Sequence, residues 1–299
     1  LHERASDLVA QLTQLLDSGT HDQVHWYETT PHGFSLNATP LDLAGPLREL
    51  RAQTRAAWIY TSATLSVAGR FDHFARQLGL EDPVTLSLQS PFDYSRQALL
   101  WMPTGLPEPS ALDYTDRVID AVLPALAASK GRAFLLFTSH RALRRAAERL
   151  TELAAPYPLF VQGTAPRHQL LEDFRQSGNG VLLGAASFWE GVDVVGEALS
   201  LVLIDKLPFA APDDPVLEAR LKMLRDEGRN PFVEWQVPNA VIALKQGSGR
   251  LIRDTHDRGV LVLCDPRLSS KPYGRLFLAS LPDMPRTRDL GAVEGFFRS

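Results

Sequence analysis

Cysteine is almost absent from this sequence. Cys264 is the one cysteine in 299 residues, and it lies inside the apolar run 259–264. One thiol cannot build a disulfide framework, a cysteine-based zinc site or a four-cysteine iron–sulfur cluster. We therefore expect Cys264 to be a buried structural thiol.

Long apolar runs and an excess of basic charge are also missing. No run approaches the roughly 20 apolar residues of a membrane span, and the N-terminus has no signal-peptide pattern. Lys and Arg number 31 against 35 Asp and Glu, a net charge of −4. This gives no global signal for nucleic acid, although a local basic groove is compatible with it. We expect a cytoplasmic protein with no membrane contact, and the start at Leu1 rather than Met indicates a piece of something longer.

The first 90 residues hold few strands. Hydrophobic content of 44% and charged content of 22% are typical of a globular protein. Apolar spacing predicts a helix over 1–17, adjacent strands in "VHWYET" and "GFSLNAT", and helices in "LAGPLRELRAQ" and "GRFDHFARQLGL". The runs "AAWIYTSATL" and "VTLSLQS" are expected to be strands, as is "QALLWMP" just after residue 90. These strands are too few for a complete sheet, so we assign 1–89 to an incomplete domain.

A regular alternation follows residue 90. Helices are expected at 113–129, in "RALRRAAERLTEL", in "RHQLLEDFRQS", at 214–227 and at 235–252. Strands are expected in "RAFLLFTSH", "PLFVQG", "GVLLGAAS", "ALSLVLIDKLPF" and "GVLVLCD". Continuous apolar strands that alternate with helices predict an α/β domain over 90–299, with a parallel sheet covered by helices on both faces.

Polar and aromatic side chains follow several of these strands. Active groups of such sheets gather at the carboxyl ends of the strands. The residues concerned are Thr61, Thr64, Thr138, Ser139, Gln162, Ser187, Phe188, Trp189, Glu190, Gly191 and Asp193. Each also has a simpler interpretation: the hydroxyls as helix N-caps, the two aromatics as core, and the carboxylates as solvated loop residues.

The stretch "QGSGRLIR" places two arginines, Arg250 and Arg253, three residues apart before an apolar strand. We expect them on one face of a helix, within reach of one ligand. They could equally be surface arginines. The "GSG" is not a dinucleotide fingerprint, because it lacks a third glycine and follows a helix, which argues against a nicotinamide-dependent enzyme.

The order of these motifs resembles the superfamily 2 DNA helicases of the DinG and XPD type, most closely the bacterial DinG/YoaA branch. "TSATL" (61–65) is similar to the third motif of that family and "LLFTSH" (135–140) to the fourth. "GAASFWEGVDVVGEALSLVLIDKLPF" (184–209) is similar to the fifth and "QGSGRLIR" (246–253) to the sixth. The resemblance implies RecA-like architecture: the complete second motor domain, preceded by the end of the arch region and of the first motor domain.

Two parts of the family pattern are missing from the chain. It has neither the phosphate loop G-x-x-x-x-G-K-[ST] nor an acidic box for magnesium. The four cysteines that bind the family's iron–sulfur cluster are absent too. ATP and Mg²⁺ would thus be bound mainly by another part of the protein, which would also hold the cluster, and we expect the chain alone to be inactive.

The resemblance also implies roles for the residues at the strand ends. Arg253 or Arg250 would be the arginine finger, Gln246 would sense the nucleotide, and Gly249 would allow close approach of the neighbouring domain. Glu190, Gly191 and Asp193 would belong to the nucleotide cleft and couple it to DNA. Single-stranded DNA would contact Thr61, Thr64, Thr138, Ser139, Gln162 and Ser187, with Phe188 or Trp189 stacking on bases. Translocation would run 5′ to 3′.

A second hypothesis is a non-catalytic binding module. The YoaA branch is associated with the chi subunit of the DNA polymerase III clamp loader. The terminal segment "DLGAVEGFFRS", with Phe296 and Phe297, could dock such a partner. The simpler alternative is a helix that caps the sheet.

Overall fold

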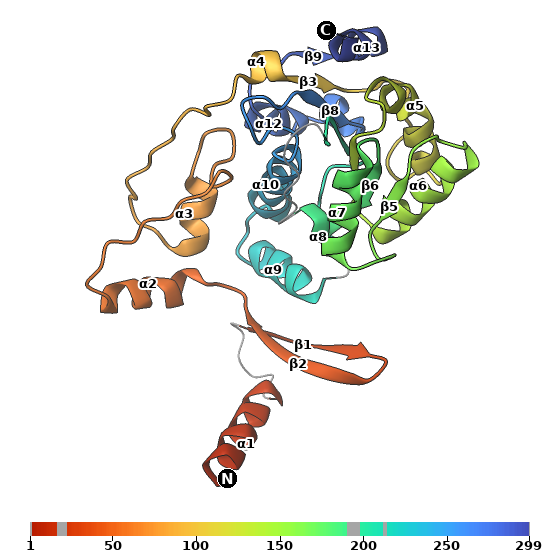
Figure 1. The fold of residues 1–299 in the computed structure, drawn as a ribbon. Coiled ribbons are helices and arrows are strands. Elements are labelled where there is room, and N and C mark those ends of the chain that lie inside the picture. Colours follow the sequence, from red (N-terminus) through yellow and green to blue (C-terminus); the bar gives the residue numbers. More distant parts are fainter. Residues whose placement is uncertain (1, 17–22, 190–197, 212–213, 299) are drawn as a thin grey trace. The chain divides into compact units, whose positions relative to one another are not determined.

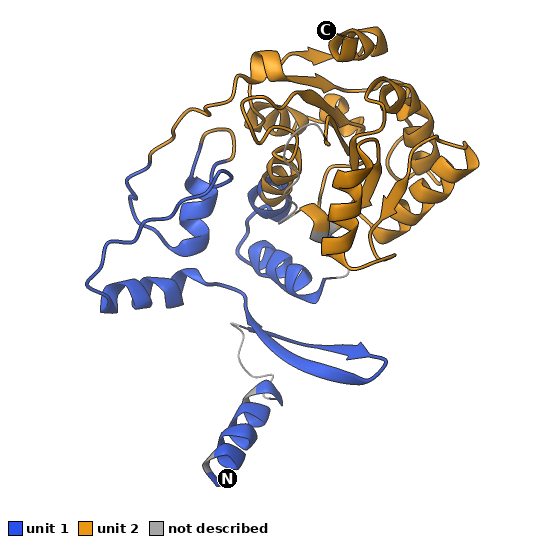
Figure 2. Cartoon of the chain, viewed as in Figure 1, with its two compact units in different colours: residues 1–66, 70–85, 210–238 blue, residues 67–69, 86–209, 239–299 orange. Residues whose placement is uncertain are grey.

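Two compact units make up the chain (Figure 2). The computed structural model describes residues 2–16, 23–189, 198–211 and 214–298. Unit 1 contains residues 1–66, 70–85 and 210–238, and unit 2 contains residues 67–69, 86–209 and 239–299. The segment 210–238 clusters with unit 1, whereas the sequence pattern grouped it with everything after residue 90.

Unit 2 is built on a parallel sheet of seven strands in the order β5-β6-β4-β7-β8-β3-β9. The strands are β3 (Ala98–Trp101), β4 (Ala133–Leu136), β5 (Leu159–Val161), β6 (Val181–Gly184), β7 (Leu201–Ile204), β8 (Gly259–Leu263) and β9 (Arg286–Thr287). All recorded pairings among them are parallel. The α/β fold predicted from the sequence is confirmed, because continuous apolar strands need cover on both faces.

Helices cover both faces of this sheet (Figure 1). On one face, α5 (Tyr114–Ala128), α6 (His140–Glu152) and α13 (Leu290–Arg298) pack on alternate strand residues such as Leu135 and Leu203. On the other face, Phe188 of α8 (Ala186–Trp189) meets Phe134 of β4 edge to face, with ring centroids 6.5 Å apart. The remaining described helices of unit 2 are α4 (Tyr94–Gln97), α7 (Arg167–Ser177), α10 (Val237–Ser248, in unit 2 from residue 239), α11 (Arg267–Ser270) and α12 (Gly274–Ser280).

Unit 1 has a two-stranded antiparallel hairpin and short helices. Its elements are α1 (His2–Leu16), β1 (Gln23–Thr30), β2 (Gly33–Pro40), α2 (Ala44–Gln53), α3 (Asp72–Leu78), α9 (Pro215–Asp226) and a π-helical turn (Phe232–Gln236). The predicted hairpin is confirmed, with Gln23 opposite Pro40 and Thr30 opposite Gly33. The helix predicted in "GRFDHFARQLGL" is confirmed as α3, which ends at Gly79 in the left-handed conformation.

Two predicted strands are absent. Residues 57–60 and 84–90 form no strand pairing, and Ile59 is 84% exposed. A strand is stable only where a neighbouring strand pairs with its N–H and C=O groups. In the described ranges, neither stretch lies beside such a strand, although both have the apolar composition of one.

The helix expected at 235–252 ends earlier. α10 (Val237–Ser248) stops at Ser248, and i-to-i+3 hydrogen bonds from Arg250 N to Gly247 O and from Leu251 N to Ser248 O tighten the chain after it. Glycines at 247 and 249 weaken helix propensity at this point. Arg250 and Arg253 therefore do not share a helix face, which corrects the sequence-based expectation.

The C-terminal helix α13 caps the sheet. Val293 is fully buried in the core of unit 2, Phe296 and Phe297 pack against that core, and the Arg258 guanidinium lies 4.0 Å from the centre of the Phe296 ring. In the structure, this segment is a helix that caps the sheet, which was the simpler of the two alternatives. Among the described residues, no helix combines the length and the apolar character needed to cross a bilayer.

Candidate functional site

The carboxyl ends of the central strands in unit 2 meet at one edge of the sheet. Thr138 follows β4 by two residues, Gln162 follows β5, and Asp205 and Cys264 follow β7 and β8. Because all these strands are parallel, their ends lie together. Side-chain hydrogen bonds hold the loops that leave this edge.

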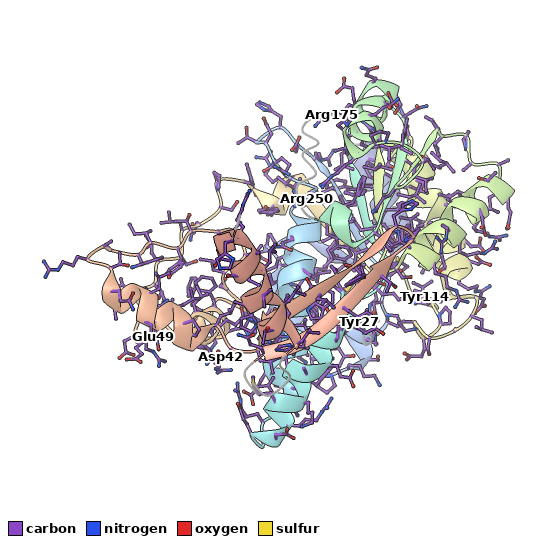
Figure 3. All side chains as sticks on the ribbon, turned by 90° about the horizontal axis from the view of Figure 1, so that it is seen from below. Tyr27, Asp42, Glu49, Tyr114, Arg175 and Arg250 are labelled. Atoms are coloured by element: carbon purple, nitrogen blue, oxygen red, sulfur yellow. The ribbon has the colours of Figure 1, made fainter. Side chains whose placement is uncertain are left out.

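Arg250 is fixed to the loop after β6. Its Nε and Nη2 groups donate hydrogen bonds to the backbone carbonyl of Trp189 at 3.1 and 2.7 Å. Trp189 ends the short helix α8, whose last carbonyl groups lack partners within the helix. Arg250, labelled in Figure 3, thereby connects the two longest sequence motifs, 184–209 and 246–253.

Arg253 is held by its main chain. The Arg253 and Asp254 N–H groups donate to Oδ2 of the buried Asp257 at 2.7 and 2.9 Å. The Gln97 side-chain amide donates to the carbonyls of Asp254 and Asp257 at 2.9 and 2.8 Å. The turn 253–257 is therefore clamped from both sides, and the half-exposed Arg253 starts from a fixed backbone.

Gly247 allows a close approach within unit 2. A Cβ at position 247 would lie 3.0 Å from the Trp189 ring and 3.2 Å from Ile204. A Cβ at the exposed Gly249 would meet only the backbone oxygens of its own turn, Lys245 O at 3.2 Å and Gln246 O at 3.7 Å. Thus α10 packs on the Trp189 ring through Gly247.

Gln246 and Lys245 occupy the last turn of α10. Both are half buried, and burial lowers the pKa of the Lys245 ammonium. A cation that is partly out of water gains more from a nearby anion than a fully solvated one. Lys245, which is half buried, would therefore gain from a nearby anion.

Thr138 and Ser139 begin the segment that leads into α6. The Thr138 N–H donates to Asp205 Oδ1 at 3.0 Å, and the Ser139 hydroxyl accepts from Ala142 N at 3.2 Å as the N-cap of α6. Ser139 has the capping role that was the simpler alternative. Its exposed position at the strand edge is still compatible with a phosphate contact.

Gln162 connects two strand ends. Its Oε1 accepts a hydrogen bond from Ala185 N at 2.6 Å, which joins the end of β5 to the end of β6. Phe188 and Trp189 are 3% and 4% exposed, and the Trp189 indole N–H points to Phe137 O at 3.4 Å. Neither ring offers a face for base stacking in this structure, so both belong to the core.

The remaining sequence candidates are placed elsewhere or outside the described residues. Thr61 and Thr64 belong to unit 1, where the Thr64 hydroxyl lies 3.2 Å from that of Ser62. Ser187 belongs to α8, and its side chain is outside the described part. Glu190, Gly191 and Asp193 also lie outside the described residues.

Two carboxylates that anchor the strand ends were not among the site residues predicted from the sequence. Asp205 and Asp265 follow β7 and β8, are 1% and 4% exposed, and accept backbone N–H bonds from neighbouring strand exits. Burial raises the pKa of Asp205 to about 7. An aspartate directly after a wholly apolar strand is the signal that could have found them, because such a carboxyl group is unlikely to reach water.

Unit 1 contains a separate cavity of about 160 Å³. The Arg220 guanidinium lies over the Trp235 ring at 4.3 Å, and its Nε is buried without a hydrogen-bond partner in the described part of the chain. Beside it, Arg229 and Arg76 both pair with Glu234, at 2.8 and 3.5 Å. No group of three or more His, Cys, Asp or Glu side chains suited to a metal ion occurs in the described ranges.

Comparison with protein families gives a match that covers more than half of the chain. Residues 122–284 match the family described as "Helicase C-terminal domain". The "ATP-dependent DNA helicase YoaA" of Escherichia coli (strain K12) is 48% identical over 98% of this chain and 46% of the relative. The "ATP-dependent helicase DinG" of Mycobacterium tuberculosis (strain ATCC 25618 / H37Rv) is 36% identical over 88% of this chain and 40% of the relative. The chain thus spans about half the length of the curated relatives it matches.

Solved structures give the same fold. A structure titled "XPD_Helicase" superposes with a TM-score of 0.63 at 18% identity, over 93% of this chain and 50% of that one. At this identity the likeness supports the RecA-like architecture alone. It agrees with the parallel seven-stranded sheet of unit 2.

Proposed function

The chain belongs to the helicase C-terminal domain family, and from this premise we propose that it is the C-terminal motor part of an ATP-dependent DNA helicase. In this function, unit 2 supplies cations to ATP hydrolysis and surface contacts to single-stranded DNA. The observation that carries the proposal is the junction between Arg250 and the Trp189 carbonyl, which brings the two motifs of residues 184–209 and 246–253 to one strand edge.

ATP hydrolysis needs positioning and charge stabilisation rather than covalent help from the protein. ATP with Mg²⁺ supplies the phosphoryl group that is transferred to water. Arginine suits the transition state because its guanidinium is always charged and matches phosphate oxygens with a planar fork. We assign the role of principal arginine finger to Arg253, because two N–H groups of Arg250 already hold the Trp189 carbonyl.

The chain fits only half of a nucleotide site. It has no phosphate loop, so the triphosphate and Mg²⁺ would be held by another part of the protein. Gln246 and Lys245 at the end of α10 would face the nucleotide together with the arginines. Glu190, Gly191 and Asp193 keep their proposed place in the cleft. An iron–sulfur cluster does not fit these residues, since the single cysteine, Cys264, is buried.

Single-stranded DNA is the substrate that the strand edge supports. Thr138, Ser139 and Gln162 offer hydroxyl, amide and backbone groups that can bind phosphates without reading sequence. Ser187, Thr61 and Thr64 remain proposed contacts. Translocation from 5′ to 3′ rests on the family resemblance, and strand displacement from duplexes with either a 5′ or a 3′ tail would test the direction.

Docking of a partner such as the clamp-loader chi subunit through α13 is the alternative function. Phe296 and Phe297 would have to turn towards the partner for it, yet both are half buried against the core of unit 2. This observation favours the motor function.

ATP turnover tests the proposal. We expect the 299-residue chain alone to hydrolyse no ATP with or without DNA, while the longer protein that contains it does so in response to single strands. The chain alone should bind an oligo(dT) strand weakly, with affinity that falls as salt rises. Substantial turnover by the isolated chain, or binding that is tight and indifferent to salt, would contradict the proposal.

A further inference from the structure

Asp205 carries a buried carboxyl group that the proposed function does not use. Its Oδ1 accepts hydrogen bonds from the N–H groups of Thr138 at 3.0 Å and Lys206 at 2.7 Å. Its Oδ2 is also buried and has no hydrogen-bond partner among the described residues. Buried carboxylates are normally neutralised by a cation or fully hydrogen-bonded, so this arrangement calls for an explanation.

The charged and titratable groups around Asp205 are engaged elsewhere. Lys206 Nζ donates to the carbonyl of Pro109 at 2.6 Å and lies 4.7 Å from the centre of the Tyr114 ring. The Tyr114 hydroxyl donates to the backbone carbonyls of Asp205 and Cys264 at 2.7 and 3.2 Å. Within the described residues, no recorded ion pair involves Asp205.

Asp265 at the neighbouring strand end contrasts with Asp205. It pairs with Arg267 at 2.6 Å and accepts from Leu207 N at 2.8 Å, so its charge is compensated. Asp265 also places a second negative charge near Asp205. Burial is the largest cause that raises the pKa of Asp205 to about 7. Lys206 and the Thr138 and Lys206 N–H groups oppose the rise, and Asp265 adds a small part of it.

The hydrogen bond from Thr138 to Asp205 connects this titration to the strand edge. Thr138 and Ser139 lie between the end of β4 at Leu136 and the start of α6 at His140. The Ser139 hydroxyl is fixed because it accepts the capping hydrogen bond from Ala142 N. The Thr138 N–H is held by the Asp205 carboxylate at the end of the neighbouring strand. An N–H bond to an ionised carboxylate is about twice as strong as one to a neutral acceptor.

We infer that Asp205 is a positioning residue for the single-strand contact of Thr138 and Ser139. The ionised form of Asp205 fixes this contact, and the protonated form releases it. The inference rests on the proposed function, since that function assigns the DNA contact. A protonated Asp205 keeps a weaker acceptor for Thr138 and gains an O–H donor that needs a partner of its own. The ordered segment therefore loosens, and single-strand affinity falls as pH decreases through neutrality.

The stability of the chain should respond in the opposite direction. The pKa of Asp205 is raised on folding from 3.8 to about 7. Between these values the folded state binds more protons than the unfolded state, so the stability due to this group is present at low pH and lost as pH rises to about 7. Asp205→Asn removes this pH dependence without removing an acceptor for Thr138.

The experiment compares the chain, Asp205→Asn and the control Asp283→Asn, which removes an exposed carboxylate before β9, at the amino end of the sheet. Affinity for oligo(dT) by fluorescence anisotropy, melting temperature and the amide proton shift of Thr138 by NMR are recorded from pH 5.5 to 8.5. For oligo(dT), we expect the ratio of the dissociation constant of Asp205→Asn to that of the unmodified chain to be about one at pH 5.5. This ratio should rise to roughly five or more at pH 8.5. The Thr138 amide should titrate with the same midpoint, and only in chains that retain Asp205.

The outcomes separate this inference from the proposed function. If no chain binds oligo(dT) at any pH, the proposed function fails, and the positioning role fails with it. If the chains bind but the ratio for Asp205→Asn stays flat, or if the Thr138 amide does not titrate, the positioning role alone is wrong. A ratio below one at pH 8.5 would mean that the carboxylate repels the phosphates, which also overturns the inference. Asp283→Asn should follow the unmodified chain in all three measurements.

Discussion

The two halves of the segment 245–257 are held in place by different kinds of contact. In the first half, the Arg250 side chain holds the Trp189 carbonyl and Gly247 packs on the Trp189 ring. In the second half, Asp257 and Gln97 hold the backbone around Arg253. The recorded contact of Arg250 is made by its side chain, whereas the recorded contact of Arg253 is made by its backbone N–H, so removal of the two side chains should have different effects. Substitutions in the two halves therefore separate structure from catalysis.

Arg253→Ala should have the largest effect. In the longer protein, we expect DNA-stimulated ATP turnover to fall on the order of a thousandfold, because the finger pairs with charge that develops in the transition state. ATP affinity should change little, since bound ATP would be held mainly by a phosphate loop in another part of the longer protein. The melting temperature of the chain should stay within about 1 °C. A large loss of stability with normal turnover per folded molecule would assign Arg253 to the fold instead.

Arg250→Ala should lower both turnover and stability. It removes two charge-assisted hydrogen bonds to the Trp189 carbonyl, which should cost about 1 to 3 kcal/mol of unfolding free energy. Denaturant unfolding of the isolated chain measures this cost without any assumption about ATP. If Arg250→Ala leaves stability unchanged, the contact with Trp189 is not a stabilising one and the contrast with Arg253 disappears.

Gly247→Ala should be destabilising by about 1 to 2 kcal/mol, because its Cβ would press on the Trp189 ring at 3.0 Å. Gly249→Ala is the matched control, since its Cβ would meet only backbone oxygens of the same turn. Equal midpoints for the two variants in denaturant would show that the ring can move aside, and that α10 is not closely packed on α8.

Asp257→Asn should have the smallest effect, below about 1 kcal/mol. The Asn carbonyl oxygen can still accept the N–H groups of Arg253 and Asp254, although without the charge. Asp257→Ala, which removes the acceptor, should cost more and should also lower turnover by displacing Arg253. If the Ala variant retains full turnover, the fixed backbone of Arg253 does not matter for catalysis.

The sequence allowed the sheet of unit 2 to be predicted, because each strand there is a short apolar run between turn residues. The same local pattern was misleading at residues 57–60, which have no strand beside them in the described ranges. Strand formation depends on distant partners, and a single segment carries no information about them. The early end of α10 was missed for a similar reason, since its amphipathic pattern continues past Ser248 while the glycines and the contact with Trp189 end the helix.

The candidate site was predicted by residue type but not by contact. Arg250 and Arg253 were found from their motif, while their different anchoring depends on Trp189 and Asp257. The burial of Phe188 and Trp189 follows from packing under β4 and α10, which a strand-end position does not reveal. Asp205 was passed over because its role depends on a residue 67 positions earlier in the chain, Thr138.

Arg253→Lys in the longer protein tests the central claim most directly. Lysine keeps the positive charge but cannot reproduce the planar fork of a guanidinium on phosphate oxygens. With ATP saturating and single-stranded DNA present, we expect the single-turnover rate of hydrolysis to fall at least about a hundredfold, while the dissociation constant for ATP and the melting temperature stay close to those of the unmodified protein. Hydrolysis by Arg253→Lys at the rate of the unmodified protein would contradict the account, because the guanidinium fork would then not be needed at this position.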